Sequence, residues 1–276
     1  MLQQTRVAAV LAHYRRFLRR FPDVRTLARG GEEQVLAAWS GLGYYRRARM
    51  LHRAARVVVR EHDGQLPRDV AALRGLPGIG RYTAAAIGSI AFDVPAAVVD
   101  GNVERVLARL DGKALRNGEN WKRAQRLLDP QQAGDFNQAM MELGATVCLP
   151  EKPRCGECPV AGFCMTQGER REPAKAPAAR RKQQTAYALA RRDGSVRLVR
   201  RAASESLMPG MWELPAFIPN GIEPILRLRH AITATDHAVA VYASATAKGK
   251  WVEAACLSEL PLTGLARKIL RRVGVL

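Results

Sequence analysis

Four of the five cysteines lie in one short segment, CLPEKPRCGECPVAGFC, with the spacing C-x6-C-x2-C-x5-C. They are Cys148, Cys155, Cys158 and Cys164. Four thiolates this close in sequence can bind one inorganic centre, and a disulfide framework does not suit a basic intracellular protein. Zinc and a [4Fe–4S] cluster both accept four thiolates, but an all-cysteine zinc site usually has two C-x2-C pairs, and this segment has one. We favour the cluster because of the hairpin described below. We expect Cys256, which stands alone, to be a buried apolar residue.

A carboxylate stands where a helical pattern begins: Asp100 is followed by Gly101, Asn102 and an apolar-periodic run. One interpretation is a helix N-cap, a common position for Asp. The other is catalytic, with the carboxylate facing a groove and stabilising positive charge that develops on a deoxyribose ring. The two roles are compatible.

The segment LPGIGRYTAAAIGSIAF predicts a helix–hairpin–helix, because Pro77, Gly78 and Gly80 make a tight turn between apolar, Ala-rich segments. Glycines let the backbone approach a ligand closely, and the N–H groups that open the second helix point at an anion such as a DNA phosphate. An ordinary helical hairpin would show the same residues, so LPGIG alone leaves both interpretations open.

The charge favours a polyanionic partner: Lys+Arg 44 against Asp+Glu 25 gives +19, with a pI near 10.7. A general bias toward Arg is the alternative explanation. The segment GLGYYRRARMLHRAARVVVREH predicts a long basic helix, with Tyr44 and Tyr45 at its start. A ring there could stack on a base or wedge between base pairs, and a core role for one of the two tyrosines is equally open.

The 276 residues suffice for two domains. The first segment predicts an amphipathic helix from the first residue, whose apolar side is Val7, Val10, Leu11, Tyr14, Phe17, Leu18 and Phe21. Residues 168–184 have the composition of a basic Pro/Ala linker, and after them the period changes to that of strands, in TAYALARR, SVRLVRR, HAVAVYASA and KWVEAAC, closed by the helix LTGLARKILRR. No apolar run of about 18 residues occurs, so we expect no transmembrane helix. We also expect a cytoplasmic, monomeric protein, associated with the nucleoid if the source is bacterial.

In this order, MLQQTRVA, WSGLGYYRRARMLHRAA, LPGIGRYTAAAI, VVDGNVERVLARL, FNQAMMELGATVC and the cysteine pattern resemble the adenine DNA glycosylase family over residues 1–167. These are helix–hairpin–helix enzymes that excise adenine mispaired with 8-oxoguanine. The segment LVRRAASESLMPGMWELPAF resembles that family's Nudix-like C-terminal domain, which reads 8-oxoguanine, over residues 185–276. The Nudix box with its run of glutamates is absent, so no pyrophosphatase activity is inferred. The resemblance implies a mostly α glycosylase domain with an iron–sulfur loop, followed by a small α+β domain.

The resemblance also implies roles for single residues. Asp100 would stabilise an oxocarbenium-like sugar and Asn102 would support it, while the four cysteines would bind the [4Fe–4S] cluster. The residues that it places on double-stranded DNA containing A:8-oxoguanine or A:G pairs are Leu2, Gln4, Thr5, Tyr44, Leu76, Pro77, Gly78, Gly80, Tyr82, Lys152 and Arg154. Gln4 and Tyr44 would intrude into the duplex.

The sequence departs from the family at two places. The family's catalytic glutamate lies two residues before the position of Met1, so either the start is assigned too late or the product is truncated and inactive. The family's Phe-Ser-His turn is replaced by RHAITATDH, in which His230, Thr233 and His237 are polar candidates without a clean match.

Two alternative functions follow from these comparisons. Thymine-glycol-type glycosylase/lyases carry a nucleophilic lysine where this chain has Tyr82, so a monofunctional glycosylase fits better. A lesion-binding protein without catalytic activity is the second alternative.

Overall fold

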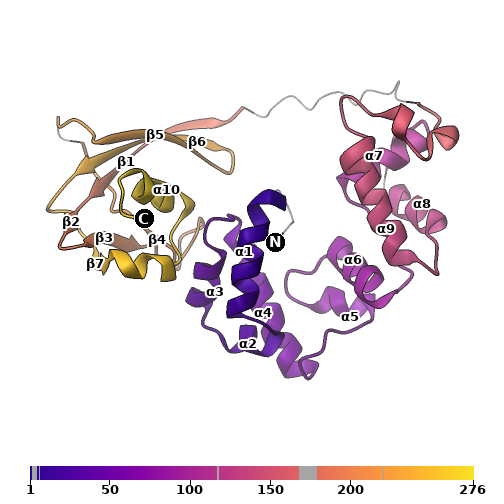
Figure 1. Ribbon diagram of the computed structural model, residues 1–276, viewed down its shortest axis with the longest axis horizontal. Helices are drawn as coiled ribbons and strands as arrows, with labels where there is room; N and C mark the ends of the chain where they lie inside the picture. The colour runs from indigo at the N-terminus through magenta and orange to yellow at the C-terminus, as the bar shows by residue number, and fades with distance from the viewer. Residues whose placement is uncertain (2–4, 6, 117, 168–178, 220) are drawn as a thin grey trace. The chain divides into compact units, whose positions relative to one another are not determined.

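The computed structural model describes residues 1, 5, 7–116, 118–167, 179–219 and 221–276. The chain forms two compact units, Met1–Arg60 with Pro177–Leu276, and Glu61–Ala176. Figure 1 shows the helices and strands of both units. The domain boundaries predicted from the sequence, at 1–167, 168–184 and 185–276, are a different division and stay a prediction. Leu2 and Gln4 lie outside the described residues.

The first unit begins with four helices, α1 (Val7–Arg20), α2 (Val24–Arg29), α3 (Glu32–Trp39) and α4 (Tyr45–Glu61). Their core is aromatic: Phe17 packs on Phe21 and Trp39, with ring centroids 5.1 and 5.9 Å apart. The predicted basic helix is confirmed as α4.

The predicted apolar side of α1 is partly wrong. Val10, Phe17 and Phe21 are buried, but the other three described side chains are exposed, at 52%, 51% and 41% for Leu11, Tyr14 and Leu18. Residues three or four apart share a helix face, so these three form a second apolar stripe beside the buried one.

The C-terminal β region (residues 179–276) belongs to the same unit. Its strands are β1 (Arg181–Leu189), β2 (Arg191–Arg192), β3 (Ser195–Arg200), β4 (Trp212–Glu213), β5 (Leu226–Ile232), β6 (Thr235–Ala243) and β7 (Lys250–Glu253). One sheet has the order β1-β6-β5, with β1 and β6 parallel; in the other, β3 pairs with β2, β4 and β7. Strand β1 begins inside the segment predicted to be a linker, because its pairing with β6 extends to Arg181.

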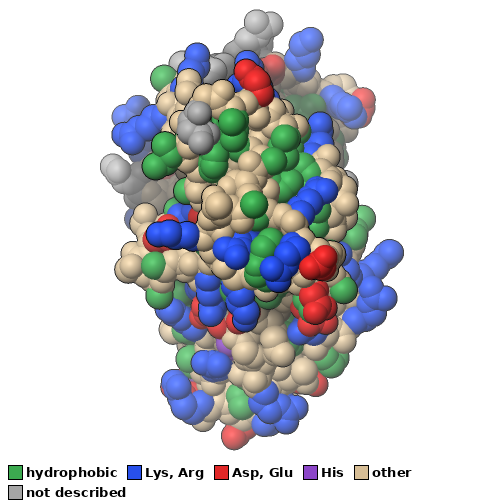
Figure 2. All heavy atoms as spheres, turned by 90° about the vertical axis from the view of Figure 1, so that its left-hand side faces the viewer, with side chains coloured by type: hydrophobic (Ala, Val, Ile, Leu, Met, Phe, Trp, Pro, Cys, Tyr) green, Lys and Arg blue, Asp and Glu red, His purple; other side chains and the backbone are tan. Residues whose placement is uncertain are grey.

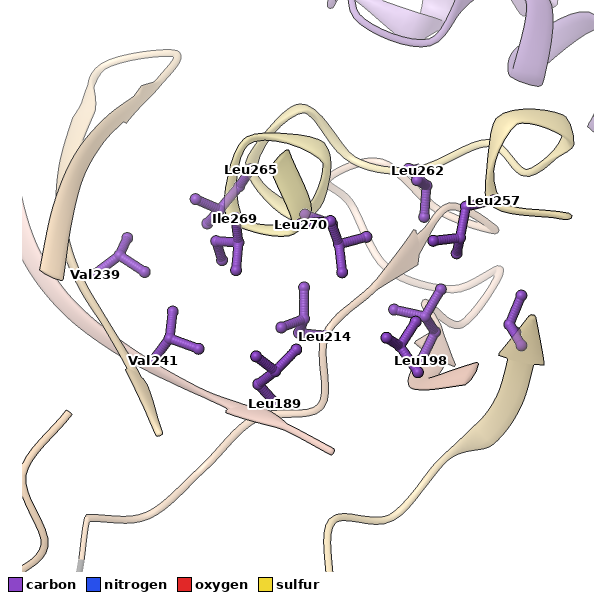
Figure 3. Close-up of a cluster of buried hydrophobic side chains, with 13 residues drawn as sticks. Leu189, Leu198, Leu214, Val239, Val241, Leu257, Leu262, Leu265, Ile269 and Leu270 are labelled. Atoms are coloured by element: carbon purple, nitrogen blue, oxygen red, sulfur yellow. The ribbon is translucent and has the colours of Figure 1, made fainter. Parts of the chain in front are cut away.

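Helix α10 (Gly264–Arg272) packs between the sheets. Its Leu265, Ile269 and Leu270 point toward Leu214 and Val239 in one buried cluster (Figure 3). On the face that Figure 2 shows, Lys and Arg side chains are widely spread, with fewer Asp and Glu side chains among them.

The expectation that Cys256 is buried is wrong. Strand β7 ends at Glu253, and Ala254–Glu259 forms a 3-10 helix (η4) in place of a longer strand. The alternation of the strand is therefore lost, so Leu257 is buried and Cys256 is exposed.

The second unit is helical. Its elements are α5 (Val70–Gly75), α6 (Arg81–Phe92), α7 (Gly101–Leu110), α8 (Glu119–Leu127), α9 (Ala133–Glu142), the π-helix η1 (Leu143–Val147) and the 3-10 helices η2 (Cys155–Glu157) and η3 (Ala161–Phe163). Helix α9 approaches α6 closely, since a Cβ on Gly134 would lie 2.7 Å from the carbonyl oxygen of Ser89. Across the described residues of both units, no helix is long and apolar enough to cross a membrane.

Candidate active site

The turn between α5 and α6 has the geometry of an anion-binding hairpin. Gly78 has a φ of +79°, a conformation that favours glycine. Gly80 is the N-cap of α6 without a side-chain cap, and a Cβ there would meet nothing within 4 Å. The first N–H groups of a helix have no acceptor within it, so this end of α6 offers donors and a positive dipole to an anion. Leu76, only 3% exposed, anchors the hairpin in the core, and Pro77 is half-buried.

Asp100 is the N-cap of α7, as predicted. One carboxylate oxygen accepts from the Val103 backbone N–H at 2.8 Å, and the other accepts from Nδ2 of Asn102 at 3.2 Å. The residue is half-buried. These two donors orient the carboxylate.

The extended segment that leads into Asp100 is held by one buried amide. Asn137, on α9 and 2% exposed, donates to the carbonyl of Ala96 at 2.8 Å and accepts from the Val98 N–H at 3.0 Å. It also donates to the Ser89 hydroxyl on α6 at 2.9 Å. Asn137 therefore sets where Asp100 lies relative to α6 and the hairpin. Its place in the FNQAMMEL segment is the only sequence signal for this role.

A buried arginine joins Asp100's partner to the cysteine segment. Arg105, 8% exposed, donates to Oδ1 of Asn102 at 2.9 Å, to the carbonyl of Gly144 at 2.7 Å and to the carbonyl of Cys148 at 2.9 Å. Gly144 lets η1 come this close, because a Cβ there would lie 2.6 Å from Cβ of Asn102. Sequence reasoning missed Arg105 and Gly144, although Arg105 lies three residues after Asn102 on one helix face.

Tyr82, in the first turn of α6, belongs to the same site. Its hydroxyl donates to Sδ of Met141 at 3.4 Å. Burial, and then the negative charge of Asp100, raises the pKa of the Tyr82 hydroxyl. The phenol is thus kept neutral near the carboxylate.

The four cysteines lie at the ends of the three short helices η1, η2 and η3, which follow α9 along the chain. Cys148 ends η1, Cys155 begins η2, and Cys158 and Cys164 end η2 and η3. Two of them meet Arg109, which is 3% exposed: its Nη1 donates to Sγ of Cys148 at 3.3 Å, and its carbonyl lies 3.5 Å from Sγ of Cys164.

The surroundings of Cys164 lower the pKa of its thiol. Burial raises its pKa, but hydrogen bonds from Thr166 and Gln167 and the charge of Arg109 outweigh burial, so the pKa lies below the usual value. Among the described residues, no group of three or more His, Cys, Asp and Glu side chains has an arrangement that could hold a metal ion.

The loop between the first two cysteines is basic and exposed. Arg154 makes an exposed ion pair with Glu157 at 3.8 Å, and its N–H donates to the carbonyl of Val147 at 2.9 Å. Lys152 is exposed. Both cations can therefore reach an anion in solvent.

A basic cleft of about 750 Å³ lies in the second unit, beside the start of α6. Arg81, the first residue of α6, stacks on the ring of Trp121 at 3.9 Å. The other cations that line the cleft are Arg74, Lys113, Lys122, Arg123 and Arg126, of which Arg123 pairs with Asp111. Sequence reasoning did not identify this cleft.

In the first unit, Tyr44 stands on a turn before α4 with a φ of +47° and 55% exposure, whereas Tyr45 is 5% exposed and part of the core. Tyr45 is therefore the tyrosine with the core role, and Tyr44 is the one whose ring is free to contact a ligand. The guanidinium of Arg47 lies 5.2 Å from the Tyr44 ring and donates to the Met1 carbonyl at 3.1 Å and to Oγ1 of Thr5 at 3.0 Å.

Comparison with known proteins identifies the family. Residues 1–128 match the model of the HhH-GPD superfamily base excision DNA repair protein. The adenine DNA glycosylase of Mus musculus is 51% identical over 171 residues, which are 59% of this chain and 33% of that protein. The chain thus spans about a third of the length of this relative.

Solved structures agree with this assignment. A thermostable thymine-DNA glycosylase is 30% identical, with a TM-score of 0.57 over 61% of this chain and 81% of its own. A trapped covalent complex of endonuclease III with DNA is 26% identical, with a TM-score of 0.55 over 61% and 80%. The adenine DNA glycosylase of Mus musculus, at 51% identity, is more similar to this chain in sequence than the thymine-DNA glycosylase or endonuclease III structures. The chain therefore belongs to the HhH-GPD superfamily of base excision DNA repair proteins.

Proposed function

We propose that this protein is an adenine DNA glycosylase that removes adenine mispaired with 8-oxoguanine or guanine. The observation that carries the proposal is the Asp100 carboxylate, which Val103 and Asn102 orient within the same compact unit as the anion-binding hairpin. Similarity to adenine DNA glycosylases and to a DNA-bound endonuclease III supports DNA as the partner.

The reaction hydrolyses the bond between C1′ of deoxyribose and N9 of adenine, after the base is flipped from the stack. As the bond breaks, its electron pair leaves with adenine and positive charge develops on the sugar. The Asp100 carboxylate stabilises this charge, as one carboxylate does in glycoside hydrolysis. A water oxygen then bonds to C1′ and loses a proton.

Adenine leaves as a neutral base only after it is protonated. We assign this acid role to no residue of the sequence given. Tyr82 stands where a lyase has its lysine, and its neutral phenol forms no Schiff base, so hydrolysis without strand cleavage is proposed.

Binding to DNA is assigned to three surfaces. The Leu76–Gly80 hairpin holds a phosphate with the N–H groups of α6, and Lys152 and Arg154 add positive charge. The exposed ring of Tyr44 enters the duplex, together with Gln4, near the lesion.

The four cysteines fit a [4Fe–4S] cluster by their donor set. Two of the thiols contact Arg109, Cys148 at its guanidinium and Cys164 at its backbone carbonyl. When bound, the cluster would supply no redox step and would fix the basic loop that carries Lys152 and Arg154. The hydrogen bonds of Cys164 favour the thiolate that ligation needs.

The β region is proposed to be a Nudix-like domain that reads 8-oxoguanine. Thr233 is exposed at the turn between β5 and β6, with a φ of +50°. His230 and His237 instead face each other across the two strands, and His237 lies 3.0 Å from Oγ1 of Thr185. Of these three candidates, Thr233 has the placement that suits a contact with a base.

A single-turnover excision assay on an A:8-oxoguanine duplex tests the proposal. The chain as given is compared with a form extended to upstream in-frame codons, and Asp100→Asn in the active form is expected to slow excision by at least about a hundredfold. Excision by the extended form supports the proposal. Duplex binding without excision by either form would establish a lesion-binding protein and refute the glycosylase.

A further inference from the structure

The turn that carries Tyr44 is a strained piece of backbone. Gly41 has a φ of +104°, Gly43 a φ of +71° and Tyr44 a φ of +47°. The left-handed conformation is unfavourable for a tyrosine and persists only where surrounding structure holds it.

The two ends of the turn are hydrogen-bonded to the β region. The hydroxyl of Ser40 donates to the carbonyl of Leu262 at 2.8 Å, and the hydroxyl of Tyr45 lies 3.4 Å from the same oxygen. The Gly41 N–H in turn donates to the Tyr45 hydroxyl at 3.4 Å. Residues on either side of Tyr44 therefore converge on one carbonyl, more than 200 residues away in sequence.

An arginine of α10 completes this support. Arg267 donates from Nη2 and Nε to Oγ of Ser40, at 3.0 and 3.3 Å. Ser40 is 5% exposed, and its hydroxyl uses both its donor and its acceptor capacity. Burial, and then the charge of Arg271, lowers the pKa of Arg267, as expected for a guanidinium removed from water.

The carbonyl of Leu262 is itself fixed. Leu262 is fully buried, and its neighbours pair with Trp212: the Trp212 N–H donates to the carbonyl of Pro261, and the Thr263 N–H donates to the carbonyl of Trp212, both at 2.9 Å. A rigid acceptor on the β region thus holds a strained turn on the helical part of the same unit.

Other contacts already hold the N-terminal helices and the β region of this unit together. Met211, fully buried, already packs into the aromatic core of α1, α3 and α4, and Nε1 of Trp212 donates to Glu33 at 3.0 Å. The hydrogen bonds of Arg267 and of the Leu262 carbonyl are instead made to Ser40 and Tyr45, the residues at the two ends of the strained turn.

We propose that Arg267 and the Leu262 carbonyl are positioning groups that act through Ser40 and Tyr45 to present the Tyr44 ring to DNA. This inference rests on the proposed function, in which Tyr44 enters the duplex. The β region would then position Tyr44, in addition to any contact that it makes with a base itself.

A double-mutant cycle in the full chain tests the inference. Binding of a labelled A:8-oxoguanine duplex is measured by fluorescence anisotropy for Arg267→Met, Tyr44→Ala and the double variant, with Arg272→Met as the control for loss of an exposed charge on the same helix. We expect Arg267→Met to weaken binding by about tenfold, Arg267→Lys to restore part of the loss, and the control to stay within about twofold.

The decisive value is the effect of Arg267→Met in the Tyr44→Ala background. A further loss below about twofold supports positioning through Tyr44, whereas a full additional tenfold loss overturns it. As a second readout, 2-aminopurine beside the lesion reports unstacking by the ring, and its fluorescence gain should fall in Arg267→Met. If that variant does not fold, Ser40→Ala takes its place in the same cycle.

The two proposals fail in different ways. If Tyr44→Ala binds the duplex as well as the unmodified chain, the proposed role of Tyr44 is wrong and the positioning role falls with it. If Tyr44→Ala weakens binding but the Arg267 effect is unchanged beside it, only the positioning role is wrong.

Discussion

Replacing Gly144 by alanine tests the close approach between η1 and the start of α7. A Cβ at Gly144 would lie 2.6 Å from Cβ of Asn102 and 3.0 Å from its backbone carbon and oxygen. Carbon atoms in contact prefer about 3.5–4.0 Å, so the two segments must separate by about 1 Å. Overpacking of this kind costs about 1–3 kcal/mol of unfolding free energy.

The displacement also reaches the proposed catalytic carboxylate. It moves the Gly144 carbonyl from Arg105, now 2.7 Å away, and moves Asn102, which donates to Asp100 at 3.2 Å. A misplacement of about 1 Å at a reacting group can cost about a hundredfold in rate. We therefore expect slower single-turnover excision as well as lower stability.

Urea unfolding followed by circular dichroism measures the first effect, and excision by the active form measures the second. Gly75→Ala is the matched control, because a Cβ at Gly75 meets nothing within 4 Å, and its stability should stay within about 0.5 kcal/mol. Unchanged stability of Gly144→Ala would refute the steric argument. Lower stability with an unchanged rate would refute the route through Asn102.

Substitutions at Arg105, Gly80 and Tyr187 give three further predictions. Arg105→Gln leaves the Gly144 and Cys148 carbonyls without their cationic donor. The unfolding free energy, measured by urea titration, should therefore fall by about 2–4 kcal/mol. A loss below about 0.5 kcal/mol would contradict a stabilising role for the hydrogen bonds of Arg105. Gly80→Ala should keep its stability, because the space around it is open, but should weaken duplex binding in anisotropy titrations; equal affinity would argue against a phosphate at the hairpin. Burial, and then the charge of Glu213, raises the pKa of Tyr187 to about 12, so the unfolded chain ionises this tyrosine first, and stability falls as pH rises above about 10. The unfolding midpoint of Tyr187→Phe should fall less steeply than that of the unmodified chain between pH 9 and about 11.5. Parallel curves for the two proteins would rule out the raised pKa of Tyr187.

Local features of the site could be predicted from the sequence because neighbouring residues determine them. The hairpin needs glycine at a positive φ, Asp100 caps the helix that follows it, and the basic helix α4 begins at Tyr45, one of the two tyrosines expected at its start. Each depends on a few consecutive residues and on backbone geometry.

Features that depend on long-range packing could not be predicted in this way. The sequence does not show that Leu11 and Tyr14 stay outside the core, or that Cys256 is exposed after β7 ends early. Burial depends on which other segment covers a face, and helical periodicity alone does not determine that.

The amino-acid sequence by itself determined the hairpin, the capping aspartate, the cysteine pattern and the resemblance to a glycosylase family. Tertiary structure alone decided that Arg105 joins Asn102 to the carbonyl of Cys148, and that Ser40 meets Leu262 and Arg267. The physical reason is that a buried polar group must find its partner wherever folding removes water, and that partner can lie more than 200 residues away along the chain.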